Sequence, residues 1–231
     1  MNHIEQNVHN IEDQLKKSLD ISNRDRVDLH VVVVTKYVSI EEAEKVVSLG
    51  YTHLGENRPE GLIQKQEVLQ QKEIVWHYIG SLQTRKVKQV INRIDYLHSL
   101  DRMSLAEEIE KRAEKPVSCF LQVNVSGEES KSGFSSDEVI ETIEALSKFK
   151  KIRIVGLMTM APKLAEEQVI RKVFSDLKKL REKIVSLDLE YAPCAELSMG
   201  MSQDYPLAIE EGATFVRIGS AFFKETEADK T

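Results

Sequence analysis

The sequence predicts an α/β protein, built as a single (β/α)8 TIM-type barrel with an extra N-terminal helix. Eight short apolar segments alternate with helical patterns, as expected for parallel strands covered by helices. No Gly-rich turn follows the first strand, which disfavours an open doubly wound sheet. The 231 residues suffice for one large core, and no Pro-, Gly- or Ser-rich linker divides them. We therefore expect one domain over residues 1–231.

The extra helix comes first. Ile4, Val8, Ile11, Leu15 and Leu19 are spaced three or four residues apart, which places them on one face of an amphipathic helix. We expect this helix to pack outside the main core.

The strands and helices of the barrel follow in alternation. The predicted strands are 30–35, 51–55, 74–80, 94–98, 117–125, 152–159, 196–198 and 214–219. The predicted helices are 39–50, 59–70, 83–92, 104–114, 135–149, 166–187 and a short helix capped by Asp204, with Pro206 in its first turn and Gly212 just past its end. Capping boxes are expected at Ser39 with Glu42, Ser104 with Glu107, and Ser135 with Glu138.

Composition excludes several classes of protein. The chain has 32 Lys and Arg against 38 Asp and Glu, a net charge of −6, which disfavours nucleic-acid binding through bulk charge. Its longest apolar stretches, such as 31–34, are far shorter than the roughly 20 residues that cross a bilayer. The N-terminus also lacks the pattern of a signal peptide. We expect a cytoplasmic protein without a membrane or nucleic-acid partner.

The cysteines and histidines do not indicate a metal site. Cys119 and Cys194 lie in apolar segments without metal-type spacing, so we expect buried, reduced thiols. The six histidines contain no closely spaced pair of the kind that binds zinc on a helix. We predict that the protein has no metal.

Lys36 is the first candidate for chemistry, because barrel sites lie where the strands end. It follows four valines and Thr35, which predicts an amine on a partly desolvated wall of the barrel mouth. Desolvation lowers the pKa of a lysine and makes it competent for Schiff-base formation. The alternative is an ordinary solvated charge.

Two turns near the end of the chain predict a phosphate site. Ser198-x-Gly200-x-Ser202 precedes the helix capped by Asp204 and offers hydroxyl and backbone N–H groups. Gly219 ends the eighth strand, where barrels often complete such a site. Each turn alone could be a capped loop with a buried methionine. Together they favour phosphate binding.

Seven ordered motifs resemble the pyridoxal phosphate homeostasis proteins, also called the proline synthase co-transcribed family. The motifs are VTK at 34–36, GENR at 55–58, WHYIGSLQ at 76–83, KxG at 131–133, GLMxM at 156–160, LSMGMSxD at 197–204 and VRIG at 216–219. The resemblance covers essentially the whole chain. It implies a barrel like the N-terminal domain of alanine racemase, which is the type III fold of pyridoxal phosphate (PLP) proteins.

The resemblance also implies a cofactor and its ligands. PLP would be held covalently, as a Schiff base on Lys36, without established catalytic turnover, in a protein of vitamin B6 and amino-acid homeostasis. The residues implied to hold the phosphate are Ser198, Met199, Ser202, Gly219 and Ser220. Arg217 would face the pyridine nitrogen, where a permanent positive charge weakens the ring as an electron sink. The residues implied to line the ring pocket are Asn57, His77 and Met158, although His77 alone could be a satisfied core histidine.

The sequence departs from the family pattern at two loops. Arg58-Pro59-Glu60-Gly61 replaces the usual Val-Gln-Glu, and Lys224 stands where a glycine is common after the eighth strand. A basic run at 85–88 is either a solvated helix face or, through Lys86, an alternative amine or a surface phosphate site.

Three other functions stay open. A PLP-dependent racemase or decarboxylase of the same barrel type needs a second acid/base group, for which Tyr37, Tyr78 and Tyr205 are the candidates. A barrel that binds a sugar phosphate non-covalently would use the same turns without Lys36. An interaction scaffold would need neither. We expect a non-enzymatic monomer that binds PLP, with PLP-dependent apoenzymes as possible recipients of the cofactor.

Overall fold

The computed structural model describes residues 3–70, 73–128 and 131–225. The strands are β1 (His30–Val34), β2 (His53–Glu56), β3 (Val75–Tyr78), β4 (Tyr96–Leu100), β5 (Val117–Asn124), β6 (Phe134–Ser135), β7 (Ile152–Met158), β8 (Glu196–Met201) and β9 (Phe215–Ile218). The α-helices are α1 (His3–Ile21), α2 (Ile40–Ser48), α3 (Pro59–Val68), α4 (Val87–Val90), α5 (Met103–Arg112), α6 (Val139–Leu146), α7 (Glu167–Val185), α8 (Tyr205–Glu210) and α9 (Ser220–Phe223). Short 3-10 helices cover Arg26–Asp28, Thr84–Lys86 and Ile91–Arg93.

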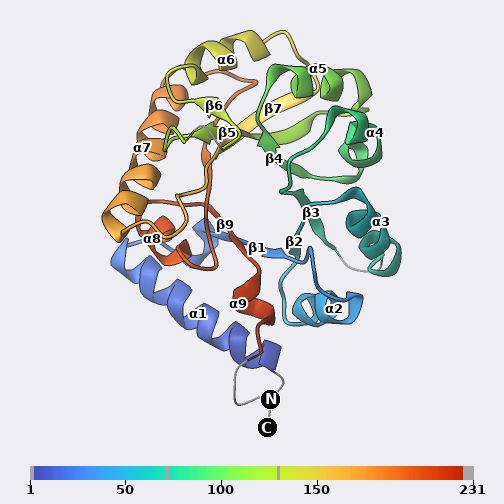
Figure 1. Cartoon of the computed structure of the whole chain (residues 1–231), viewed down its shortest axis with the longest axis vertical. Coiled ribbons are helices and arrows are strands. Elements are labelled where there is room, and N and C mark those ends of the chain that lie inside the picture. Colours follow the sequence, from blue (N-terminus) through green and yellow to red (C-terminus); the bar gives the residue numbers. More distant parts are fainter. Residues whose placement is uncertain (1–2, 71–72, 129–130, 226–231) are drawn as a thin grey trace.

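Eight parallel strands close into a barrel with the helices outside it (Figure 1). The order around the ring is β1, β2, β3, β4, β5, β7, β8 and β9, and β9 pairs with β1. The predicted (β/α)8 fold is therefore confirmed. The sequence analysis did not predict β6, a two-residue strand that pairs only with β5. It lies outside the ring of eight.

The apolar side chains form two layers. The larger core lies between the strands and the surrounding helices. From β1 it includes Val31 and Val33. A small cluster fills the inside of the barrel and consists of Val32, Phe120, Met158 and Phe215. Alternate residues of each strand thus face the helices and the barrel interior, as the period of a strand requires.

The extra helix α1 lies across α8 and α9 on the outside of the barrel (Figure 1). Its predicted apolar face is buried at Ile4, Ile11, Leu15 and Leu19. The Asn7 side chain donates hydrogen bonds to the carbonyl oxygens of Phe222 and Lys224, at 2.9 and 3.0 Å. These bonds fasten α1 to the end of α9.

Several predicted helices differ in detail. The Ser39–Glu42 capping box is present, with both reciprocal hydrogen bonds. The prediction of a capping box at Ser104 is wrong, because α5 begins at Met103 and Arg102 occupies the cap position. Ser135 and Glu138 do bond to each other, but α6 begins only at Val139. The helix predicted over 83–92 is divided between α4 and two 3-10 turns, because its apolar side chains cover too short a stretch for one amphipathic helix.

Within the described residues, no helix has the length and apolar character that spanning a membrane requires. Cys119 and Cys194 are buried and unpaired, and burial raises the pKa of each thiol to about 12. Both residues therefore match the expectation of buried thiols.

Candidate functional site

The candidate site lies at the mouth of the barrel where the strands end. Lys36 directly follows the β1 segment and Thr35, as predicted, but its side chain is exposed. Its ammonium lies 5.3 Å from the centroid of the Tyr37 ring, which is itself 74% exposed. The expectation that the barrel wall desolvates this lysine is therefore wrong. Lys36 projects beyond the valines of β1 into solvent.

The backbone on which Lys36 stands is nevertheless fixed. The Thr35 hydroxyl donates a hydrogen bond of 2.6 Å to the Glu56 carboxylate, at the end of β2. The same carboxylate oxygen lies 2.9 Å from the Lys65 ammonium on α3. All three side chains are buried. This network joins the residue before Lys36 to β2 and α3.

The two predicted phosphate turns are bound to each other. The Ser202 hydroxyl, after β8, accepts hydrogen bonds from the backbone N–H groups of Gly219 (3.1 Å) and Ala221 (3.4 Å), after β9. Gly200 has φ +92°, and a Cβ there would lie 2.5 Å from that of Ala208. A side chain on Gly219 would likewise press on Val34, at 3.2 Å. Both turns thus depend on glycine for their close approach.

The remaining phosphate candidates differ in position. Ser220 is exposed at the start of α9, whereas the Met199 side chain is fully buried in the outer core, so that only its backbone could serve a ligand. Asp204 occupies the predicted cap position of α8, but its carboxylate accepts the Met201 N–H at 2.6 Å instead of capping the helix. Asp204 therefore tightens the turn after β8.

Arg217 lies inside the barrel on β9. Its guanidinium donates to the Ser198 hydroxyl and, at 3.1 Å, to the Thr159 carbonyl oxygen. Burial lowers the pKa of Arg217 to about 10, and the nearby Asp204 charge acts in the opposite direction. Arginine still carries its proton at neutral pH. A buried positive charge therefore sits close to the mouth.

The structure does not support a phosphate contact from the Ser198 hydroxyl. Ser198 is fully buried, and its oxygen is bonded to Arg217 and, at 2.8 Å, to His98 Nδ1. Both partners lie inside the barrel. The Ser198 hydroxyl therefore holds the Arg217 guanidinium by a hydrogen bond and does not face the mouth. Sequence reasoning missed this role because it considered the SMGMS turn by itself.

Three histidines continue this network across the barrel. His98 Nε2 lies 2.9 Å from His77 Nδ1, and His77 Nε2 lies 2.9 Å from His53 Nδ1. Burial is the main cause that lowers the pKa of His53 to about 4, and it lowers those of His77 and His98 well below the ordinary value. The three rings are therefore neutral at pH 7. The sequence signal for this row is one histidine on each of successive predicted strands.

The residues expected around the cofactor ring lie at different depths. Asn57 follows β2 at the mouth, and its side-chain oxygen is buried without a hydrogen-bond partner among the described residues. Its backbone oxygen accepts a 3.0 Å bond from the Tyr78 hydroxyl. Met158 is buried in the small interior cluster. His77 is a satisfied core histidine, stacked on Tyr96 with ring centroids 4.8 Å apart.

The other lysines considered are engaged in surface contacts. Lys86 lies 3.5 Å from the Glu60 carboxylate, which is largely exposed. Lys131 pairs with Glu128 at 2.6 Å and donates to the Met160 carbonyl oxygen at 3.3 Å. Neither lysine lies on β1 or in the turns after β8 and β9. Among the described residues, no group of three or more His, Cys, Asp or Glu is arranged to hold a metal ion.

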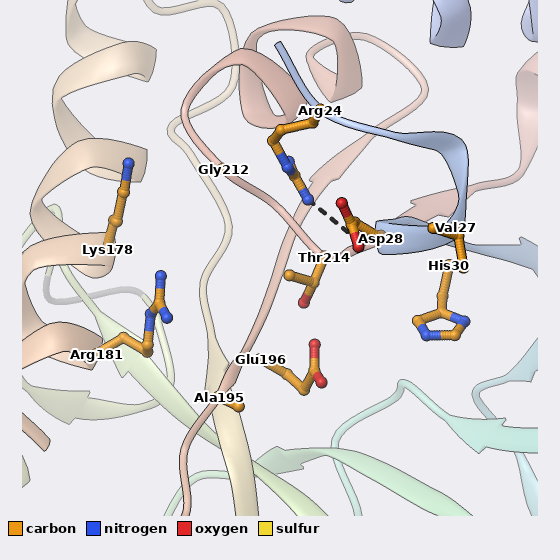
Figure 2. Close-up of a pocket in the computed structure, with 10 residues that line it drawn as sticks. All are labelled: Arg24, Val27, Asp28, His30, Lys178, Arg181, Ala195, Glu196, Gly212 and Thr214. Atoms are coloured by element: carbon orange, nitrogen blue, oxygen red, sulfur yellow. Dashed lines mark hydrogen bonds between the residues drawn. The ribbon is translucent and has the colours of Figure 1, made fainter. Parts of the chain in front are cut away.

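A pocket of about 480 Å³ lies at the opposite end of the barrel, where β1, β8 and β9 begin (Figure 2). Lys178 and Arg181 border it from α7, and Glu196, Thr214 and His30 border it from the strands. None of the predicted cofactor ligands lines it. It is separate from the candidate site.

Similarity to known proteins identifies the fold class of the barrel. The family model described as "Alanine racemase, N-terminal domain" matches residues 3–227. An alanine racemase from Corynebacterium glutamicum superposes with a TM-score of 0.74 at 14% identity, covering 96% of this chain and 62% of the racemase, a likeness of fold alone. The fold and the matched domain define a barrel of the alanine racemase N-terminal type.

Closer relatives specify the family. The pyridoxal phosphate homeostasis protein of Aquifex aeolicus is 37% identical over 217 residues, which are 92% of this chain and 94% of the relative. That of Helicobacter pylori strain J99 is 38% identical over 200 residues, 84% of this chain and 87% of the relative. The chain belongs to the pyridoxal phosphate homeostasis protein family, which confirms the resemblance seen in its motifs.

Two solved structures resemble the whole chain. An unknown protein from Bifidobacterium adolescentis has a TM-score of 0.91 and 35% identity, covering 96% of this chain and 94% of that one. PipY from Synechococcus elongatus, with PLP bound, has a TM-score of 0.79 and 27% identity, covering 91% of this chain and 99% of PipY. Both similarities extend over the entire barrel.

Proposed function

We propose that this protein binds PLP at the mouth of its barrel and acts in vitamin B6 and amino-acid homeostasis as a carrier of the cofactor. The observation that carries the proposal is the pair of joined turns after β8 and β9. In them the Ser202 hydroxyl and the backbone N–H groups of Gly219 and Ala221 meet at one point. Membership of the family and the PLP-bound PipY relative support the same ligand.

Residues at the barrel mouth have the donors and acceptors that binding PLP would require. Ser202, Ser220 and the backbone at Met199, Gly200 and Gly219 would bind the phosphate, since hydroxyl and backbone N–H groups are ordinary phosphate ligands. The Gly219 N–H donates to Ser202 in the ligand-free protein and would turn to the phosphate when PLP binds. Arg217, held by Ser198 and Thr159, would keep the pyridine nitrogen unprotonated. The unpartnered Asn57 side-chain oxygen is a free acceptor at the same mouth. Met158 and His77 would lie beneath the ring.

Lys36 would hold the cofactor covalently. PLP supplies an aldehyde, which reacts reversibly with a primary amine. The Lys36 Nζ would supply that amine and would hold the cofactor covalently. Because Lys36 is exposed, the amine is accessible to the incoming aldehyde and to other amines. Accessibility suits a carrier that gives up its cargo to PLP-dependent apoenzymes.

Storage fits the site better than turnover. Tyr37 is largely exposed beside Lys36, while Tyr78 is hydrogen-bonded to the Asn57 backbone and Tyr205 is buried in the core. Burial raises the pKa of Tyr78 to about 12 and also raises that of Tyr205, so both phenols stay protonated at pH 7 and are not available as bases. We extend the proposal to a cytoplasmic monomer formed by one domain over residues 1–231, without catalytic turnover.

Reduction with borohydride tests the covalent site. The protein, incubated with PLP, is reduced and digested, and mass spectrometry maps the pyridoxyl group. We expect it on Lys36, and we expect Lys36→Ala to lose the aldehyde–amine absorption band while Lys86→Ala, a lysine on the outer surface, keeps it. Label on Lys86 or Lys131 instead would overturn the assignment. A protein that takes up no PLP would contradict the proposed function, and amino-acid turnover by the loaded protein would favour the racemase alternative.

A further inference from the structure

Two buried histidines and the half-buried His53 form one hydrogen-bonded row with Ser198 and Arg217. The row runs from β2 through β3 and β4 to β8 and β9, across the inside of the barrel. Its members are His53, His77, His98, Ser198 and Arg217. The proposed PLP contacts do not determine how this row is protonated. Its chemistry follows from the donor and acceptor capacity of each group.

Arg217 fixes the start of the row. A guanidinium has only donors, so Ser198 Oγ accepts from Arg217. Ser198 is fully buried, and among the described residues the other partner of its hydroxyl is His98 Nδ1. The hydroxyl hydrogen therefore needs His98 Nδ1 as its acceptor, because a buried donor without a partner is unfavourable. His98 must be neutral, with its proton on Nε2.

The same donor and acceptor argument applies to the next two rings, His77 and His53. His98 Nε2–H donates to His77 Nδ1, which leaves the His77 proton on Nε2. His77 Nε2–H then donates to His53 Nδ1, so His53 also carries its proton on Nε2. Every hydrogen bond points the same way, from Arg217 toward His53. Reversing any one ring would place two donors, or two acceptors, face to face.

The rings of the row are held in place by aromatic neighbours. His98 stacks on Phe120 with centroids 4.4 Å apart, and His77 stacks on Tyr96 at an interplanar angle of 6°. At the outer end, His53 is half-buried and tilted against His30, with centroids 4.9 Å apart. His30 borders the pocket at the far end of the barrel (Figure 2). The row thus connects the two ends of the barrel interior.

We propose that His53, His77 and His98 are positioning residues, which hold the Ser198 hydroxyl in a single orientation and thereby orient the Arg217 guanidinium toward the barrel mouth. The effect of this orientation on a cofactor rests on the proposed function, since Arg217 is the group assigned to the pyridine nitrogen. The orientation itself belongs to the protein without ligand.

Nitrogen-15 NMR of the ligand-free protein tests the polarity directly. With ¹⁵N-labelled histidine at pH 7, we expect His53, His77 and His98 each to bear hydrogen on Nε2 and none on Nδ1. Hydrogen on Nδ1 of any of the three, or a doubly protonated ring, would overturn the proposal. This measurement needs no variant and no PLP.

A variant pair tests positioning. His98→Phe removes the acceptor for Ser198 and leaves an aromatic ring against Phe120. We expect the Arg217 Nε–H resonance to shift and to exchange faster with solvent in the ligand-free variant. The matched control is His30→Phe, which changes a ring in contact with His53 that makes no hydrogen bond in the row. An unchanged Arg217 signal in a folded His98→Phe would contradict positioning, as would an equal change in the control.

Ser198→Ala provides a milder change in case His98→Phe does not fold. It removes the acceptor for Arg217 and should produce the same NMR change. If PLP binds, we expect its Kd to rise roughly tenfold in Ser198→Ala, since one buried hydrogen bond that orients a ligand group is lost. An unaltered Arg217 resonance in this variant would refute the proposal. Failure of PLP to bind the natural protein would refute only the proposed function.

Discussion

Glu56 and Lys65 form a buried ion pair of 2.9 Å at the mouth of the barrel, with side chains 1% and 7% exposed. The same Glu56 oxygen accepts from Thr35, the residue before Lys36. Two charges removed from water in this way depend strongly on each other. The pair therefore couples the stability of the barrel to the position of the proposed PLP lysine.

We expect Lys65→Met to lower the free energy of unfolding by about 3 kcal/mol, because it leaves the Glu56 charge buried without its partner. Urea denaturation measures the loss. Lys86→Met is the control, since the pair of Lys86 with the exposed Glu60 should contribute less than about 1 kcal/mol. The double change Glu56→Gln with Lys65→Met should be less damaging than Lys65→Met. Equal effects of the two single lysine changes would contradict the argument.

Gly200→Ala should destabilise the end of β8, where the following turn begins. Its φ is +92°, and the added Cβ would lie 2.5 Å from Ala208 Cβ, so the change combines backbone strain with overpacking of about 1–3 kcal/mol. Gly127→Ala is a matched control, because Gly127 also has a positive φ but has no atom within 4 Å of such a Cβ. We expect denaturation to show a larger loss at Gly200, together with weaker phosphate-group binding. A larger loss at Gly127 would be incompatible with this geometry.

Acid should weaken the fold through the half-buried His53. His53 has a pKa of about 4 in the folded protein, against about 6.5 in an unfolded chain. The unfolded chain therefore binds more protons between these values, and the free energy of unfolding falls as the pH drops through this window. Urea titrations at pH 7, 6 and 5 measure the slope. His53→Gln should reduce it, and an identical slope in that variant would count against the assignment.

Asn7→Leu should loosen the N-terminal helix. The substitution keeps a similar size but leaves the Phe222 and Lys224 carbonyl oxygens without their donor, at an expected cost of about 1–3 kcal/mol. Asn10→Leu is the control, because Asn10 is exposed on the same helix and its side chain accepts a hydrogen bond from the exposed Gln6. Equal stability of the two variants in guanidinium chloride would show that the bonds to α9 do not matter.

The sequence predicted the barrel because its signals are local. The valines of β1 and the cap at Ser39 each identify an element without reference to the rest of the chain. The same approach placed Lys36 and the two turns predicted to bind phosphate at the ends of the correct strands. It failed at β6, since two residues that pair only with β5 carry no periodic pattern.

Side-chain partners were less accessible to sequence reasoning. His77 and His98 are 21 residues apart, and their rings meet only through the pairing of β3 with β4, in which His77 lies opposite Tyr96. The exposure of Lys36 also depends on how far its side chain extends past β1, which a run of valines does not determine. Ser198 was assigned to a ligand because its motif was considered without its neighbour Arg217, 19 residues later.

The pairing of β1 with β9 also bears on how the chain folds. His30 and Val31 align with Phe215 and Val216, so the ring closes through contacts between segments very distant in sequence. Contacts of such high sequence separation form slowly, and the β1 edge can find its partner only after β9 has been synthesised. Until then, the Val31–Val34 edge is an unpaired apolar strand, a known starting point for aggregation. Newly made chains should therefore depend on rapid closure, or on chaperones that cover this edge.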